Sequence, residues 1–194
     1  MIDGFHALRV RSRGQIEGED GFTLIELLVV LLIIGVLLAI AIPTFLAITN
    51  SANNTATQDN LQTALTGAKV YYTNAGQTYT NVTVSGGASS DIQQIATGMS
   101  FTTTGASSGA RLISLYTGGG GTYIILAGFS NGTNDCWGIL DIPTTQSVAV
   151  QGVTAPDTWF FVVHHSSSTT CLASTYNATT QTVSAMSLTG FPPG

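Results

Sequence analysis

The sequence predicts an α+β protein in which one long N-terminal helix packs its second half on an antiparallel sheet of about four strands. Two observations predict this fold. The segment from Phe22 to Leu46 is almost purely apolar, and its only charge is Glu26. Beyond residue 110, short apolar, β-branched or aromatic runs alternate with turn residues, which is the pattern of an antiparallel sheet.

The apolar segment is long enough to cross a membrane. As an α-helix, the stretch from Phe22 to Leu46 would reach about 37 Å, which exceeds the ~30 Å hydrocarbon core of a bilayer. A lone carboxylate costs a few kcal/mol if it faces lipid, so Glu26 is expected to find a partner. Pro43 lacks an N–H for the helix and Gly35 lowers its stability, so both are expected to weaken it locally.

An amphipathic stripe extends the helix beyond the apolar segment. We expect one helix from about Phe22 to Tyr72, ended by Asn74-Ala75-Gly76. Its second half should pack on a globular head through apolar residues that recur with the helical period. These residues are Leu61, Ala64, Leu65, Ala68 and Tyr72.

Strand signals follow in the second half of the chain. The four expected strands cover residues 111–116, 122–129, 136–142 and 158–164, with turns at Gly118–Gly121 and Asn131-Gly132. Between helix and sheet, we expect a variable segment with a short strand over 79–85 and a short helix over 90–95, capped by Ser90. Trp137 and Trp159 are expected in the core or on a sheet face.

Charge and motifs narrow the function classes. After residue 21 the chain has two basic residues, Lys69 and Arg111, against six acids, so the side chains carry 2 − 6 = −4. This balance argues against nucleic-acid binding, which needs clustered cations. There is no G-x-S-x-G elbow, and no Lys-Ser/Thr follows Gly118–Gly121, so we expect neither an enzyme nor a cofactor. Adjacent His164 and His165 on a strand point to opposite faces, so no metal site is expected.

Two cysteines and four glycosylation sequons lie beyond residue 50, where a composition rich in Ser, Thr, Gly, Ala and Asn suits a secreted domain. Cys136 and Cys171 indicate one disulfide, with two free buried thiols as the alternative. Without a CxxC pair they do not predict a zinc site. N-linked glycosylation stays open at the sequons, which begin at Asn53, Asn81, Asn131 and Asn177.

Residues 1–21 are polar and contain Arg9, Arg11 and Arg13, which by the positive-inside rule hold the N-terminus in the cytoplasm. In an ordinary secretory signal the apolar region lies inside the removed peptide. Here the polar stretch ends where the apolar segment begins. Composition alone leaves two interpretations: a removable leader, or the cytoplasmic tail of a permanent anchor.

The motif Gly21-Phe22-Thr23-Leu24-Ile25-Glu26, followed by Leu27–Val30, resembles the class III signal of type IV prepilins and pseudopilins. The resemblance covers residues 21–46. It implies that a membrane prepilin peptidase cuts after Gly21 and that the new amine of Phe22 is N-methylated. It also implies the type IV pilin fold, and a pairing of Glu26 with the Phe22 amine of a neighbouring subunit that sets recruitment and register.

The same resemblance implies two further features. The helix between Gly35 and Pro43, roughly Val36–Ile42, would unwind in the assembled filament. The Cys136–Cys171 stretch matches the disulfide-bounded C-terminal region of many type IV pilins. The implied organisation is a leader (1–21), a transmembrane and filament-core half-helix (22–49) and a head (50–194) with an amphipathic helix (50–73), a variable loop (74–110), a sheet (111–164) and a disulfide-bounded region (136–171).

The function implied is that of a major pilin, a structural subunit of a type IV pilus used for adhesion, motility or related tasks. Such a subunit is first a single-pass protein of the inner membrane and then part of an extracellular helical homopolymer. Its partners would be other copies of itself, the prepilin peptidase and methyltransferase, and the inner-membrane assembly platform. The alternative is a minor pilin or a type II secretion pseudopilin. A DNA-uptake pilin is less favoured because the head has one Lys and one Arg for phosphate contacts.

Overall fold

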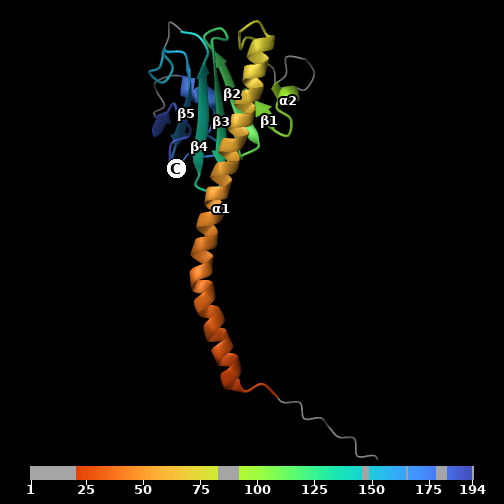
Figure 1. The fold of residues 1–194 in the computed structure, drawn as a ribbon, viewed down its shortest axis with the longest axis vertical. Helices are drawn as coiled ribbons and strands as arrows, with labels where there is room; N and C mark the ends of the chain where they lie inside the picture. Colours follow the sequence, from red (N-terminus) through yellow and green to blue (C-terminus); the bar gives the residue numbers. More distant parts are fainter. Residues whose placement is uncertain (1–20, 83–91, 146–148, 165, 178–182, 194) are drawn as a thin grey trace, which may run out of the picture. The chain divides into compact units, whose positions relative to one another are not determined.

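The computed structural model describes residues 21–82, 92–145, 149–164, 166–177 and 183–193 of the chain. It divides into an N-terminal unit that ends at Pro43 and a C-terminal unit that begins at Thr44. The helices are α1 (Leu24–Asn74), α2 (Ile92–Ile95) and the 3-10 helix η1 (Ala173–Asn177). The strands, which all belong to the C-terminal unit (Figure 1), are β1 (Ser100–Thr102), β2 (Leu112–Gly118), β3 (Tyr123–Ser130), β4 (Asp135–Ile142), β5 (Asp157–Val163) and β6 (Ala185–Ser187).

Helix α1 confirms the predicted long helix and its stop signal. It ends at Asn74, and Gly76 follows with a φ of 74°. The backbone N–H of Gln77 donates to the carbonyl of Tyr72 at 2.9 Å, which is the closing bond of a Schellman motif. Glycine suits this position because the left-handed conformation strains any residue that carries a Cβ.

The first half of α1 has no buried residue. Every residue from 21 to 48 is exposed, although nearly all of them are apolar. By length and composition, α1 is able to cross a membrane. The helix runs unbroken through Gly35 and Pro43 in this structure.

The sheet has the strand order β1-β2-β3-β4-β5-β6. All neighbours are antiparallel except β1 and β2, which are parallel. The four predicted strands are confirmed as β2 to β5. The expected count of four strands is wrong, because β1 and β6 add a three-residue strand at each edge.

The segment between α1 and the sheet differs in part from the prediction. The strand expected over 79–85 is wrong over its described residues, because 79–82 form a turn in which Asn81 has a φ of 62°. Residues 83–85 lie outside the described part. The short helix is confirmed as α2, whereas its expected cap, Ser90, is not among the described residues.

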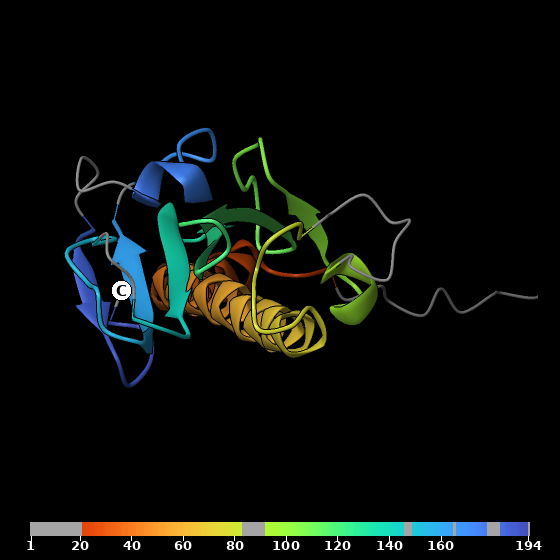
Figure 2. The same cartoon turned by 90° about the horizontal axis from the view of Figure 1, so that it is seen from above.

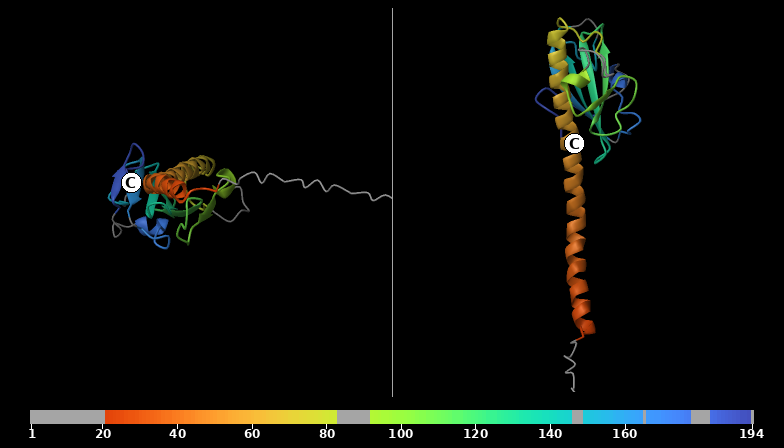
Figure 3. Two further views of the ribbon diagram at one scale, coloured as in Figure 1. Left: turned by 90° about the horizontal axis from the view of Figure 1, so that it is seen from below. Right: turned by 90° about the vertical axis from the view of Figure 1, so that its right-hand side faces the viewer.

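Both faces of the sheet are covered. Seen from above, the second half of α1 lies along one face and η1 lies over the other (Figure 2), and the side view agrees (Figure 3). As a result every residue of β3 is buried. Ile124 and Leu126 belong to the cluster that contains α1, and the alternate residues Ile125 and Ala127 belong to the cluster that contains η1.

The predicted helix stripe and core tryptophans are largely confirmed. Leu61, Ala64, Leu65 and Ala68 are buried against the sheet. The stripe ends differently, because the fully buried tyrosine is Tyr71, and Tyr72 is half-buried. Trp137 is buried in the cluster on the α1 side, and Trp159 is half-buried in the other.

The disulfide between Cys136 and Cys171 is confirmed and fully buried. Ser107 attaches the segment around Cys171 to the sheet through two hydrogen bonds. Ser107 accepts the N–H of Phe129 at 2.7 Å through Oγ, and its own N–H donates to the carbonyl of Cys171 at 2.8 Å. These bonds, with the disulfide, fix the chain that leads into η1 on the sheet face opposite α1.

Candidate functional site at the start of helix α1

Gly21 and Phe22 precede the first turn of α1 in an open position. No atom lies within 4 Å of the place where a Cβ on Gly21 would be, and the side chain of Phe22 is 84% exposed. The Gly21–Phe22 peptide bond is therefore accessible to another protein. Residues 1–20 of the expected leader lie outside the described part of the chain.

Thr23 and Glu26 form a capping box that starts α1. The backbone N–H of Thr23 donates to Oε2 of Glu26 at 2.9 Å, and the Thr23 hydroxyl donates to the same oxygen at 2.8 Å. In return, the backbone N–H of Glu26 donates to Oγ1 of Thr23 at 3.3 Å. Each side chain satisfies an N–H that the first helical turn leaves without a partner. The pattern Thr-x-x-Glu is a sequence signal for this cap, but the sequence-based prediction assigned no role to Thr23.

The carboxylate of Glu26 keeps one oxygen for another contact. Both hydrogen bonds from Thr23 end on Oε2, and Oε1 has no partner among the described residues. Glu26 is exposed, as are all of its neighbours on the helix. A cationic group of another molecule can therefore reach Oε1 without breaking the capping box.

The surface that follows Glu26 is apolar on all sides of the helix. The exposed fractions of Leu27, Leu31 and Leu37 are 55%, 61% and 62%, and the other large side chains up to Ile48 are similarly exposed. A continuous apolar surface of this size marks a region that lipid or another protein covers. Gly35 lies in open space and Pro43 lies inside the helix, so neither takes part in a packed contact that explains its presence.

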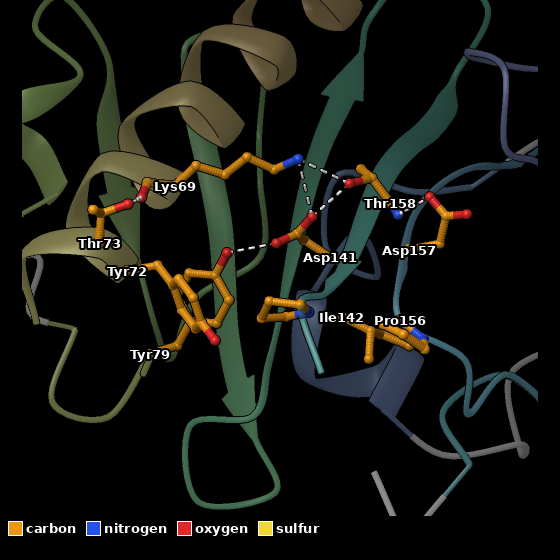
Figure 4. Close-up of a pocket in the computed structure, with 10 residues that line it drawn as sticks. Lys69, Tyr72, Thr73, Tyr79, Asp141, Ile142, Pro156, Asp157 and Thr158 are labelled. Atoms are coloured by element: carbon orange, nitrogen blue, oxygen red, sulfur yellow. Dashed lines mark hydrogen bonds and ion pairs between the residues drawn. The ribbon is translucent and has the colours of Figure 1, made fainter. Parts of the chain in front are cut away.

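A second polar cluster lies in the C-terminal unit, between α1 and the sheet (Figure 4). Asp141 of β4 is buried, and its Oδ2 accepts the hydroxyl of Tyr79 at 2.6 Å. Its Oδ1 accepts the hydroxyl of Thr158 at 2.5 Å and lies 3.4 Å from Nζ of Lys69, which also donates to Thr158 at 3.0 Å. Asp141 and Thr158 face each other directly across the β4–β5 pair.

This cluster attaches α1 to the sheet. Burial, with the nearby Asp141 carboxylate, raises the pKa of the Tyr79 hydroxyl far above its usual range, so Tyr79 stays protonated and donates to Asp141. A buried carboxylate is stable when it is paired and hydrogen-bonded, and both oxygens of Asp141 are engaged. The sequence-based prediction missed these residues.

His164 makes a polar contact with Asp135. Its Nδ1 lies 3.3 Å from Oδ1 of the buried Asp135, at the end of the sheet. His165 is not among the described residues. The described part of the chain contains no group of three metal-ligating side chains.

Residues 18–42 match the family model of the prokaryotic N-terminal methylation motif. This segment is the signal of type IV prepilins, and the match includes Gly21, Phe22, Glu26 and Gly35. No curated protein and no solved structure matches the chain.

The signal and the fold agree. A long apolar N-terminal helix followed by a sheet is consistent with the type IV pilin fold. The motif supports a protein of the pilin and pseudopilin kind, and it implies a structural protein rather than an enzyme.

Proposed function

We propose that this chain is the major structural subunit of a type IV pilus and polymerises through the first half of α1. The observation that carries the proposal is a fully exposed apolar half-helix with a single carboxylate in its first turn. Lipid covers this surface before assembly, and the same surface of neighbouring copies covers it in the filament.

The signal supports the following order of events. A prepilin peptidase removes residues 1–21 on the cytoplasmic side of the inner membrane, and the amine of Phe22 is then N-methylated. An inner-membrane assembly platform passes the subunit into an extracellular filament for adhesion or motility. The exposed position of Gly21 and Phe22 supports cleavage at this bond.

Glu26 sets the register between subunits in this proposal. In an apolar bundle, its carboxylate pairs with the Phe22 amine of a neighbour. Charges interact strongly in a low-dielectric medium, so any axial slip that separates the pair is costly. The free Oε1 of Glu26 is the atom for this contact, because Oε2 is occupied by Thr23.

Substitutions at Glu26 separate its charge from its capping role. Glutamine at position 26 still accepts the bonds from Thr23 but has no charge, whereas alanine removes both. We expect Glu26→Gln and Glu26→Ala alike to leave cleaved protein in the membrane and to abolish surface fibres. The measurement is N-terminal mass analysis of sheared fibres and of the membrane fraction, which reports the cut after Gly21 and a methyl group on Phe22.

Thr23→Val is the matched control, because it removes the hydroxyl from the capping box and leaves the backbone N–H bond and the charge of Glu26. A lost cap costs about 1 kcal/mol of helix stability, which the packed filament tolerates. This variant should assemble. Normal fibres from Glu26→Gln would instead reduce the role of Glu26 to helix capping. Fibres that consist mainly of another protein, with this chain as a trace component, would make it a minor pilin or pseudopilin.

A further inference from the structure

A cavity of about 500 Å³ opens in the C-terminal unit between α1, the β3–β4 turn and the segment after β6. Its α1 side presents amide and hydroxyl groups from successive turns, among them Asn50, Asn54 and Gln58. Trp137 and Phe191 belong to the opposite wall and contact each other edge to face, with ring centroids 5.8 Å apart. The volume falls in the range of small-molecule sites, about 300–1,000 Å³.

Among the described residues, those that line this cavity have no ionisable side chain. A charged ligand would lose its hydration there and meet no opposite charge, so the cavity excludes phosphates, carboxylates and amines as main recognition elements. The lining amides and hydroxyls both donate and accept hydrogen bonds. The ligand that fits is neutral and has several hydrogen-bonding groups.

A hydrogen bond from the end of β3 holds the side chain of Asn54 in place. Its Oδ1 accepts the hydroxyl of Ser130 at 2.6 Å. Oγ1 of Thr133 lies 2.9 Å from the same oxygen, and its single proton is directed to the carboxylate of Asp135, 2.5 Å away. A side-chain amide that is held in place costs little conformational entropy when it binds a ligand.

The wall opposite α1 is apolar. Phe191 packs edge to face between Trp137 and Phe160, with centroids 5.8 and 5.0 Å apart, and Pro192 and Pro193 follow it along the cavity. The indole Nε1 of Trp137 is buried and has no hydrogen-bond partner among the described residues. Trp137 is 1% exposed and lies behind Phe191, so the accessible part of this wall is Phe191 with Pro193. Such a surface suits the C–H face of a sugar ring, while the amide side suits its hydroxyls.

We propose that this cavity binds one saccharide unit of a neutral glycan. Binding by a single open site of this kind is weak. Its strength on a cell surface rests on the proposed function, because a filament repeats the site in every subunit and multivalency raises the overall affinity.

The test uses the full chain dispersed in a zwitterionic detergent that contains no sugar. The probes are methyl glycosides of glucose, galactose, mannose and N-acetylglucosamine, with sialic acid as the anionic comparison. Saturation-transfer NMR at millimolar ligand should detect at least one neutral glycoside and no sialic acid. Binding only to sialic acid, or to none of the probes, would overturn the proposal.

Matched variants on one helix locate the site. Gln58→Glu places a charge in the cavity, whereas Gln62→Glu makes the same change one turn away, outside the lining. We expect the first to weaken glycoside binding about tenfold or more and the second to leave it unchanged, with equal thermal unfolding of both. Asn50→Ala should also weaken it, with Asn53→Ala as its control. Equal binding by Gln58→Glu and Gln62→Glu would remove the cavity as the site.

Dispersed protein keeps this test separate from the question of assembly. The Glu26→Gln variant, which should not form fibres, is expected to bind glycosides as tightly as the unmodified chain. For the unmodified chain, glycoside binding without fibre formation would contradict its role as a pilus subunit and still support the cavity as a saccharide site. Fibre formation without glycoside binding would support the pilus subunit and contradict the saccharide site. A second copy of the chain could instead cover the cavity residues in detergent. Protection of these residues by such a copy would also contradict glycan binding.

Discussion

Glu26 makes one contact within the chain and keeps a carboxylate oxygen for another. Oε2 closes the first turn of α1 with Thr23, and Oε1 remains for a partner outside the chain. The resemblance to prepilin signals predicted a role for Glu26. The Thr-x-x-Glu spacing would also have predicted the capping role of Thr23. The cap keeps the helix ordered up to the residue whose amine the proposed pairing uses.

Tyr79 predicts an alkaline limit to the stability of the C-terminal unit. Burial raises the pKa of its hydroxyl in the folded chain, so its contribution is fully present below the unfolded pKa of about 10 and is lost as the pH rises above that value. Each proton lost only on unfolding lowers the free energy of unfolding by about 1.4 kcal/mol per pH unit.

Thermal or denaturant unfolding between pH 8 and pH 11 is the measurement for this residue. Tyr79→Phe loses the hydrogen bond to Asp141 and should be less stable at pH 8, but its stability should fall less steeply above pH 10. An unchanged slope in Tyr79→Phe would show that another group, such as the buried Tyr176, causes the alkaline loss.

At the scale of elements, the predicted strands are those with strong local patterns. The runs that became β2 to β5 are apolar, and turn residues separate β2, β3 and β4. The edge strands β1 and β6 are only three residues long and contain serine and threonine, so no local pattern marks them. The strand expected at 79–85, which residues 79–82 do not form, starts at Tyr79, an aromatic residue that is buried in the cluster between α1 and the sheet without being part of a strand.

Local sequence patterns do not predict the cluster of Lys69, Asp141 and Thr158. Asp141 and Thr158 meet because of the register between β4 and β5, and Lys69 reaches them because α1 crosses that face of the sheet. None of these relations follows from the neighbouring residues in the sequence. The cavity with Asn54 depends likewise on where the β3–β4 turn meets α1.

The disulfide is expected to contribute on the order of 3–4 kcal/mol to the stability of the C-terminal unit. It joins residues 35 apart in the sequence, and closing a loop of that length restricts the unfolded chain. A double variant, Cys136→Ser with Cys171→Ser, should unfold at lower denaturant concentration. Reductant should destabilise the unmodified chain to a similar extent and leave the double variant unaffected, and no difference between the two proteins would contradict this contribution.

At the scale of the whole molecule, assembly is predicted to change the first half of α1. The helix is continuous from Leu24 to Asn74 here, although Gly35 and Pro43 both weaken it. In the filament we expect residues 36–42 to leave α geometry, which lengthens each residue from about 1.5 Å to roughly 3.3 Å and lets the fibre stretch. Electron cryomicroscopy of the fibres is the measurement, and continuous helical density over these residues would refute the unwinding.

The scarcity of basic residues also bears on how long such a fibre would persist. Once residues 1–21 are gone, trypsin-like proteases have two cleavage points, after Lys69 and after Arg111. The first lies inside α1, and the carbonyl of Arg111 accepts the N–H of Ser100 beside the paired strands β1 and β2. Digestion at Lys69 therefore requires the helix to open, and digestion at Arg111 requires the edge of the sheet to open, so an intact fibre is expected to resist trypsin-like proteases.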